Sequence, residues 1–245
     1  MYSARDPTTK VKGREVLQKA GVKTQGRVLR QEGEKLIQFF KHHALTGRPY
    51  VILKTAQTLD GKIATAKGES KWITCRQSRE HARRLRTQVD AILVGANTIL
   101  NDDPRLTSRK RKRLDPLRII LDSKLRIPLD AKALKDANAI WWSPRPTNTL
   151  RRQKHSKKKG ISVVFMKKIS IARLMTRLGR KGILSVLIEG GGNVNFSALK
   201  EKTVDKILVY VAPKILGGEK AKTSVEGKGI ETIARAIKLE KNEKH

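Results

Sequence analysis

Beyond residue 49, short runs of Val, Ile and Leu alternate with longer segments whose apolar residues recur every three or four positions. The first pattern is typical of strands buried on both faces, and the second of amphipathic helices. Strands that alternate with helices predict an α/β domain with a mainly parallel sheet. The expected strands are 50–53, 91–95, 117–122, 139–142, 161–165, 183–188 and 206–211, and the expected helices are 78–88 (with Ser78 as N-cap), 169–178 and 195–200.

The first 48 residues are polar and strongly basic, and they lack a convincing core of their own. We expect a helix over 11–20 that stops at Gly21, a strand over 22–29, and a helix over 32–43. The last of these would turn four apolar side chains inward: Leu36, Ile37, Phe39 and Phe40. A break at 46–49 then divides the chain into an N-terminal segment (1–47), a main domain (48–240) and a charged tail (241–245).

Charge narrows the range of partners. The 245 residues carry 55 Lys and Arg against 22 Asp and Glu, a formal net charge of +33, with basic clusters at 109–113 and 151–159. Such a charge favours phosphorylated ligands and would permit nucleic-acid binding. The low aromatic content of 4% and the lack of a known nucleic-acid-binding motif argue against a dedicated nucleic-acid surface.

Other features indicate the compartment. No apolar run approaches the roughly 20 residues that span a membrane, and residues 1–7 lack the apolar region of a secretory signal. The lone Cys75 cannot form an internal disulfide and is expected to be structural. One Cys and five scattered His give no zinc-like spacing, so we expect no metal site. These observations predict a cytoplasmic protein without a membrane partner.

The most informative motif spans residues 184–193, where an apolar run stops at Glu189 and three glycines before a helix begins. Backbone N–H groups in such a turn can hold a phosphate, and Glu189 would lie at the ligand-binding edge of the sheet. The alternative is a tight strand-to-helix turn with no ligand. Two more polar turns, 54–62 and 101–106, also adjoin apolar runs, which predicts one pocket built from several strand ends.

Four motifs occur in order: Lys-Thr-Ala-Gln-Thr-Leu-Asp-Gly-Lys-Ile-Ala at 54–64, Gly-Glu-Ser-Lys-Trp-Ile-Thr at 68–74, Val-Gly-Ala-Asn-Thr-Ile-Leu-Asn-Asp-Asp-Pro at 94–104, and Ile-Glu-Gly-Gly-Gly at 188–192. Together they make residues 48–238 resemble the reductase domain of the bifunctional riboflavin-biosynthesis deaminase–reductase. The resemblance implies a dihydrofolate-reductase-like α/β fold. It also implies NADPH-dependent reduction of 5-amino-6-(5-phosphoribosylamino)uracil at C1′ of the opened ribose, giving the 5-phosphoribitylamino product. Homodimers are usual in this family, and 206–211 would offer an apolar edge.

The N-terminal segment resembles the end of the deaminase half of that family, at residues 4–7, 20–22 and 32–40. The His-Ala-Glu and Pro-Cys segments that hold the deaminase zinc do not occur in the sequence. We therefore expect a deaminase remnant without deaminase activity, and a separate deaminase protein as a possible partner.

The resemblance also assigns the site. Catalysis falls to Lys54 and Glu189. Substrate contacts are implied for Ser70, Arg86, Leu106, Arg109 and Glu189. NADPH contacts are implied for Ala56, Asp60, Trp72, Thr98, Asp102, Ser123 and the run Gly191, Gly192, Asn193, Val194, Asn195, Phe196 and Ser197.

Some of these assignments have a simpler alternative. Lys54 could be a surface lysine and Trp72 a core aromatic residue. Asp60 and Asp102 lie in segments where turn or cap residues are common, and Arg109 opens a basic run. Two other functions also stay open: reduction of the diaminopyrimidine before deamination, and nucleic-acid binding without turnover.

Overall fold

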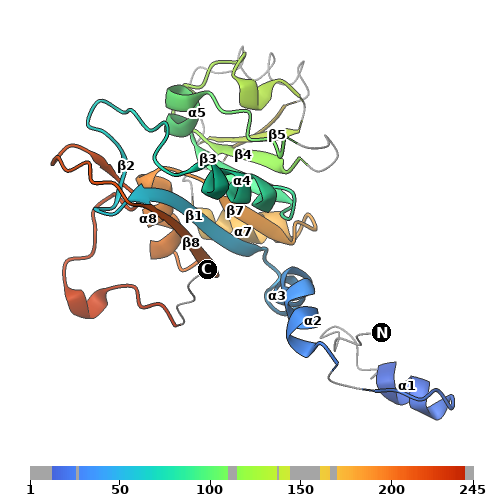
Figure 1. Cartoon of the computed structure of the whole chain (residues 1–245). Helices are drawn as coiled ribbons and strands as arrows, with labels where there is room; N and C mark the ends of the chain where they lie inside the picture. Colours follow the sequence, from blue (N-terminus) through green and yellow to red (C-terminus); the bar gives the residue numbers. More distant parts are fainter. Residues whose placement is uncertain are drawn as a thin grey trace.

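The computed structural model describes residues 13–25, 28–109, 115–136, 138–143, 161–165 and 170–240, and the side chains of 141–143 are left aside. A seven-stranded sheet with the order β6-β5-β4-β3-β7-β1-β8 forms the centre, and every pairing within it is parallel (Figure 1). The strands are β1 (Tyr50–Thr58), β3 (Ala91–Gly95), β4 (Leu117–Leu121), β5 (Ala139–Ser143), β6 (Ser162–Phe165), β7 (Ser185–Ile188) and β8 (Lys206–Ala212). The predicted α/β class with a mainly parallel sheet is confirmed.

Helices cover both faces of this sheet because its central strands carry apolar side chains on both sides. In β3 all four residues from Ala91 to Val94 are fully buried. One face packs against α7 (Ile171–Gly179) and α8 (Gly192–Lys200). The other packs against α4 (Arg76–Leu85), α5 (Ala96–Asp102) and the short 3-10 helix Lys132–Leu134. The fold thus has three layers, with its core on both sides of β3.

Strand β1 runs five residues beyond its predicted end, so 54–58 belongs to a strand and not to a turn. The extension exists because Ile52 to Thr58 pair with Lys206 to Ala212 of the edge strand β8. The turn follows at 59–61, and then β2 (Lys62–Ala64) pairs antiparallel with β9 (Lys222–Thr223). Lys54 therefore lies within a paired strand.

Helix boundaries also differ from the prediction. Helix α4 begins after Cys75, so Ser78 lies inside the helix instead of capping it. The Ser78 hydroxyl lies 3.4 Å from the exposed thiol of Cys75. Helix α5 was not predicted, and α8 starts three residues earlier than expected. Helix α5 begins directly after Gly95, the last residue of β3, so no linker marks the change from strand to helix.

The N-terminal segment projects from the body of the molecule (Figure 1). Helix α1 (Gly13–Lys19) confirms the first prediction for its described part. The strand predicted over 22–29 is wrong, because 22–25 and 28–29 have no strand structure and the side chains of Val22, Val28 and Leu29 are exposed. Their apolar side chains meet no neighbouring strand here, and a β-strand needs such a partner to form its hydrogen bonds.

The helix predicted over 32–43 is two helices, α2 (Arg30–Leu36) and α3 (Gln38–Thr46), separated at Ile37. Ile37 and Phe39 are partly buried, as expected. Leu36 is 86% exposed and Phe40 is also exposed, so the inward orientation predicted for these two is wrong. The change in helix direction at Ile37 turns only part of the apolar stripe toward the sheet.

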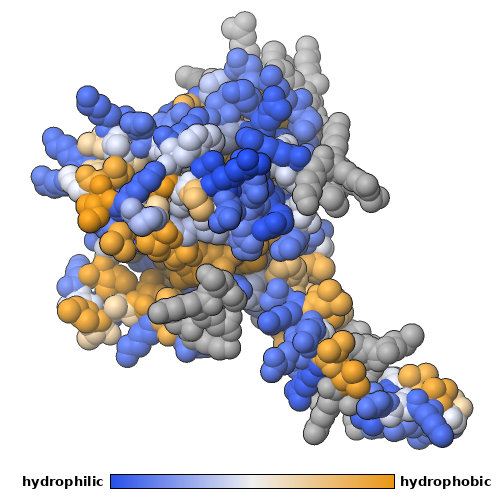
Figure 2. All heavy atoms as spheres, viewed as in Figure 1, coloured by the Kyte–Doolittle hydropathy of each residue, from blue (hydrophilic) through white to orange (hydrophobic). Residues whose placement is uncertain are grey.

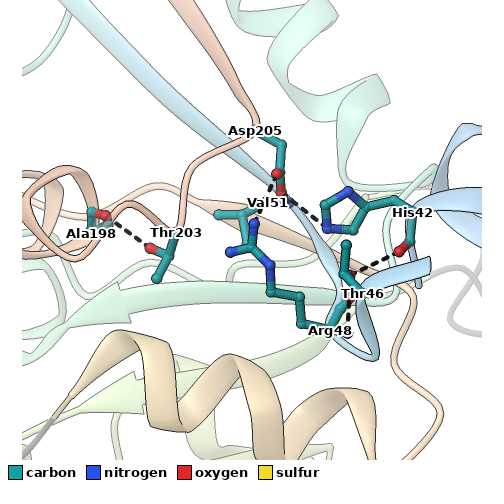
Figure 3. A network of polar contacts seen from close by, with 7 residues as sticks. All are labelled: His42, Thr46, Arg48, Val51, Ala198, Thr203 and Asp205. Carbon is teal, nitrogen blue, oxygen red and sulfur yellow. Dashed lines mark hydrogen bonds and ion pairs between the residues drawn. The ribbon is translucent and has the colours of Figure 1, made fainter. Parts of the chain in front are cut away.

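Asp205 attaches α3 to the sheet (Figure 3). Its carboxylate accepts a hydrogen bond of 2.8 Å from the backbone N–H of Val51 and lies 3.5 Å from the guanidinium of Arg48. The ring of His42, on α3, lies 3.6 Å from the same carboxylate. Burial, partly opposed by Asp205, lowers the pKa of His42. One carboxylate thereby joins α3, the start of β1 and the segment before β8.

Several sequence features lie outside the described residues: 110–113 of the first basic cluster, all of 151–159, Val11, Ile169 and the tail 241–245. Within the described part, no helix is both long and apolar enough to cross a membrane. The same part holds no grouping of three or more His, Cys, Asp or Glu side chains suited to a metal ion.

Candidate active site

The candidate active site lies at the carboxyl ends of β3 and β7 and beside the middle of β1, on the face covered by α4 and α5. Lys54 belongs to β1, and Glu189 follows β7 directly, where the pairing of Leu53 with Ile188 ends. Ile52 and Leu187 contact the same core cluster beneath α4. Side chains two residues apart on a strand point to the same face. Lys54 is two residues after Ile52 and Glu189 is two residues after Leu187, so both lie side by side on this face. The structure therefore brings together the two residues to which the resemblance assigns catalysis.

Arg86, at the C-terminal end of α4, binds Glu189 through two parallel hydrogen bonds. Its Nε donates to Oε1 at 2.9 Å and its Nη2 to Oε2 at 2.8 Å, and the two side chains are only 16% and 11% exposed. Burial raises the pKa of Glu189, but the charge and hydrogen bonds of Arg86, with the charge of Lys54, hold it below the ordinary value. Glu189 is therefore a fixed carboxylate, and a bidentate guanidinium partner sets its orientation.

Tyr210 and His81 adjoin this pair from the other side of Lys54. Tyr210 lies opposite Ala56 in the β1–β8 register, so its side chain shares a face with that of Lys54. The Lys54 ammonium lies 5.6 Å from the centre of the Tyr210 ring, and the Tyr210 hydroxyl lies 2.6 Å from Nδ1 of His81 on α4. Burial, followed by the negative charge of Glu189, raises the pKa of Tyr210. The phenol consequently keeps its proton.

Three further arginines interact with the Arg86 end of the ion pair: Arg83, Arg105 and Arg109. Partial burial, followed by the positive charges of Arg83, Arg86 and Arg105, lowers the pKa of Arg109. Figure 2 shows the most hydrophilic surface of this view over α4, which contains Arg83 and ends just before Arg86. Like charges this close destabilise one another unless an anion lies between them. The arginine cluster is thus suited to a phosphate, which accepts paired hydrogen bonds from guanidinium groups.

The glycine-rich turn after Glu189 leads directly into α8, as predicted. A Cβ at Gly190 would lie 2.8 Å from Cβ of Val194, and one at Gly95 would lie 2.9 Å from a methyl group of the same residue. The N-cap, Gly191, provides no side chain to cap the helix. The absent side chains let the ends of β3 and β7 approach the first turn of α8, whose N–H groups and dipole attract anions. This cradle fits the phosphates of a dinucleotide.

The side chains of this loop turn mainly to the C-terminal segment. Asn193 donates a hydrogen bond of 2.9 Å to Glu226, and Asn195 donates one of 2.8 Å to the carbonyl of Ser224. The buried Oδ1 of Asn195 has no partner. The ring of Phe196 packs against Gly227, and the Ser197 hydroxyl donates to the carbonyl of Asn193 at 2.8 Å. These residues support the cradle and, with Thr223, Glu226 covers Gly192, so a phosphate would meet the backbone at Gly191.

Two of the remaining predicted contacts are joined directly. The Ser70 hydroxyl donates a hydrogen bond of 3.0 Å to Asp102, the last residue of α5. Thr98 shares a face of that helix with Asp102, because the two residues are four apart. The guanidinium of Arg79 lies 4.5 Å from the ring centre of Trp72, which is exposed and therefore not a core aromatic residue.

For three predicted contacts the side chain does not face the ion pair. The carboxylate of Asp60 accepts hydrogen bonds from Thr58 and from the backbone of 216–217, which lower its pKa to about 2. It holds the segment after β8 in place. Leu106 has its side chain in the core, so only its backbone can meet a ligand. Ser123 is exposed in the turn after β4. Their ligand contacts stay predictions.

Comparison with known proteins gives the family. Residues 49–244 match the model described as the RibD C-terminal domain. The chain belongs to the RibD C-terminal domain family. A riboflavin biosynthesis protein RibD from Actinobacillus pleuropneumoniae is 39% identical over 241 residues, covering 96% of this chain and 64% of that protein. A 2,5-diamino-6-ribosylamino-4(3H)-pyrimidinone 5′-phosphate reductase from Methanothermobacter thermautotrophicus is 39% identical over 197 residues, covering 79% of this chain and 91% of that protein.

A solved structure of Acinetobacter baumannii RibD superposes with a TM-score of 0.80 at 29% identity, covering 94% of this chain and 64% of that one. The three-layer fold is therefore the dihydrofolate-reductase-like arrangement of RibD proteins, as the resemblance implied. The chain spans less than two thirds of the length of the Actinobacillus and Acinetobacter RibD proteins.

Some residues at this RibD-type site were not found from the sequence: Tyr210, His81, Arg83, Arg105 and Glu226. Tyr210 did carry a signal, because it is the polar aromatic residue in the otherwise aliphatic run before Ala212. His81 lies on a predicted helix, five residues before Arg86. Glu226 carried none, since its approach to α8 depends on the path of the C-terminal segment.

Proposed function

We propose that this chain is an NADPH-dependent oxidoreductase of riboflavin biosynthesis. It reduces 5-amino-6-(5-phosphoribosylamino)uracil to 5-amino-6-(5-phosphoribitylamino)uracil. The observation that carries the proposal is the grouping of Lys54, Arg86 and Glu189 beside the glycine-rich start of α8. Membership of the RibD C-terminal domain family supports it. A charged substrate group and a dinucleotide phosphate can bind next to each other at this edge.

The arginine cluster gives the substrate its orientation. Arg83, Arg105 and Arg109 present donors for the 5-phosphate, while Arg86 stays engaged with Glu189. Held in this way, the ribose would lie toward Lys54 and Glu189. Lys54 can stabilise negative charge on a ribose oxygen, and the fixed carboxylate of Glu189 can accept hydrogen bonds from hydroxyl groups.

The cofactor site is the cradle around α8. Backbone N–H groups at the N-terminus of α8, beginning at Gly191, would hold the dinucleotide phosphates, and Asp102 with Thr98 would meet a ribose. When bound, the nicotinamide supplies the hydride, and the protein supplies position and electrostatics. The preference for NADPH over NADH is taken from the family resemblance, and the basic surface is compatible with a 2′-phosphate.

A second candidate substrate is the undeaminated diaminopyrimidine. The Methanothermobacter relative, 39% identical to this chain, is named as a reductase of that compound. The two pyrimidines share the phosphoribosyl group that the arginine cluster would bind. Discrimination between them therefore depends on contacts with the pyrimidine ring.

Three further proposals concern partners and domains. We propose that residues 1–47 are a deaminase remnant, and that a separate deaminase supplies the substrate. We also propose a homodimer. Strand β8 is one of the two edge strands of the sheet. Val209 and Val211 are exposed on this strand, and Ile215 is exposed after it. Figure 2 shows apolar side chains gathered where β8 and the C-terminal segment lie in Figure 1. Such a surface is typical of an interface.

The test is NADPH oxidation with each pyrimidine, using wild type, Glu189→Gln and the control Glu80→Gln. Glu80 forms an exposed ion pair with Arg76 on α4, so its loss should leave turnover unchanged. We expect turnover with the deaminated pyrimidine and a fall of about 100-fold in kcat for Glu189→Gln. Turnover with the diaminopyrimidine alone would establish the second candidate, and no turnover with either by folded protein would refute the proposal.

A further inference from the structure

We propose that Tyr210 and His81 form a proton-delivery pair for this site, with Tyr210 as the acid that protonates the ribose ring oxygen. The inference rests on the proposed reduction. Its basis is geometric: the Tyr210 hydroxyl lies 2.6 Å from Nδ1 of His81, and the Tyr210 ring lies beside the Lys54 ammonium. Neither residue is among those to which the family resemblance assigns contacts.

The reduction needs a proton as well as a hydride. To open the ribose, the C1′–O4′ bond breaks and its electron pair leaves with O4′. The lone pair of the exocyclic nitrogen then forms a double bond to C1′, and O4′ must gain a proton to become a hydroxyl. The hydride subsequently adds to C1′ and restores the neutral amine. One proton is consumed in each turnover, so the site needs a donor that solvent can recharge.

The charges around Tyr210 suit it to this task. Glu189 and Lys54 face it from the sheet, while Arg84 and His81 face it from α4. Glu189 is a paired carboxylate, and it therefore has no proton to give. The phenol of Tyr210 is protonated, half-buried and on the same face of the sheet as both catalytic residues. A general acid must have its proton available and lie within reach of the reacting group.

His81 completes the path to solvent. It is exposed on α4, while its Nδ1 reaches the hydroxyl of the half-buried Tyr210. In the delivering state, Nδ1–H donates to the phenol oxygen. When Tyr210 gives its proton to O4′, His81 replaces that proton and then regains one from water. Histidine suits this transfer because its charge changes within about pH 5 to 8.

Tyr210→Phe and His81→Gln test the pair, with Tyr50→Phe and His43→Gln as matched controls. Tyr50 contacts Phe39 and His42, and His43 contacts the carbonyl of Gly179, so both controls lie outside the site. Tyr210→Phe removes the hydroxyl but keeps the ring beside Lys54. We expect it to lower kcat about 100-fold with little change in KM for the pyrimidine or for NADPH. The controls should retain wild-type kcat.

The pH profile separates proton delivery from a structural contact. In wild type, kcat should fall with rising pH, because the pair must deliver one proton in each turnover. In His81→Gln, kcat should already be lower at acidic pH, and it should depend less on pH. The double variant should be no slower than Tyr210→Phe, because both residues serve one proton path.

The outcomes also distinguish this inference from the function on which it rests. Wild-type kcat in Tyr210→Phe, or an unchanged pH profile in His81→Gln, would overturn the pair while turnover by wild type preserves the proposed reduction. Absence of turnover in wild type with both pyrimidines would remove the proposed function and the pair with it.

Discussion

The ion pair between Arg86 and Glu189 leads to a prediction about stability that does not depend on the substrate. Arg86→Met removes the guanidinium but keeps a side chain of similar length. Glu189 would then stay in a site where it is only 11% exposed, and of the two cations that lower its pKa only Lys54 would remain. Breaking a buried ion pair from one side costs about 3 to 5 kcal/mol. Because some solvent reaches both side chains, we expect a loss near the lower figure, about 3 kcal/mol.

A double-mutant cycle isolates the pair itself. Replacing both residues, as Arg86→Met with Glu189→Gln, leaves no unpaired buried charge and should cost about 1 kcal/mol or less. Urea unfolding of the four proteins then gives a coupling energy of about 2 kcal/mol or more. The matched control is the cycle at Arg76 and Glu80, an exposed pair at 2.7 Å on the same helix, for which we expect about 0.5 kcal/mol.

The dependence on pH has a definite sign. Because folding lowers the pKa of Glu189, its ionisation stabilises the protein fully above the unfolded-state pKa, and this contribution is lost as pH falls through the folded-state value. Without Arg86, burial would raise that pKa instead. The loss caused by Arg86→Met should thus be largest near pH 7 and shrink toward pH 4. A coupling energy no larger than that of the surface pair, or a loss independent of pH, would refute this account.

Single contacts give three further predictions. Glu226→Gln removes the carboxylate that contacts Asn193 in the first turn of α8. It should lower the KM for NADPH about 3-fold, as measured by initial rates. Asp205→Ala leaves the buried N–H of Val51 without its side-chain acceptor and should cost about 2 kcal/mol in urea unfolding, whereas an unchanged midpoint would contradict the attachment in Figure 3. Inorganic phosphate should raise the melting temperature more than sodium chloride of equal ionic strength, and Arg109→Gln should reduce that difference.

The sequence predicted the sheet well because its central strands are buried on both faces. An apolar run such as 91–95 has few alternatives to a parallel core strand, and the structure places β3 over those residues. The polar end of β1 could not be found in this way. Lys54 to Thr58 are held as a strand by β8, about 150 residues later in the chain. A local pattern does not contain that pairing. The strand predicted over 22–29 is wrong because its apolar pattern has no partner strand in the described part of the chain.

The candidate site likewise contains some residues that the sequence identified and others whose positions depend on long-range packing. Glu189 was evident from its motif, since a carboxylate followed by three glycines at a strand end has a recognisable chemistry. Arg86 was one of many basic residues, and its orientation toward Glu189 depends on how α4 lies over the sheet. The contact between His81 and Tyr210 joins positions 129 residues apart, one on a helix and one on the edge strand. Long-range packing decides which of several chemically suitable side chains meet.

The electrostatics of the candidate active site indicate why its charged residues are grouped together. Burial opposes the ionised form of Glu189, and Arg86 offsets this cost. The neighbouring arginine charges add to the burial that lowers the pKa of Arg109. Local rules of this kind are commonly broken at functional sites and compensated elsewhere. Here the apolar core on both faces of β3 provides the compensation, and a phosphate between the arginines would relieve the remaining repulsion. The arginine charges and the proposed ligand are therefore linked, because the phosphate of the proposed substrate carries the negative charge that offsets their mutual repulsion.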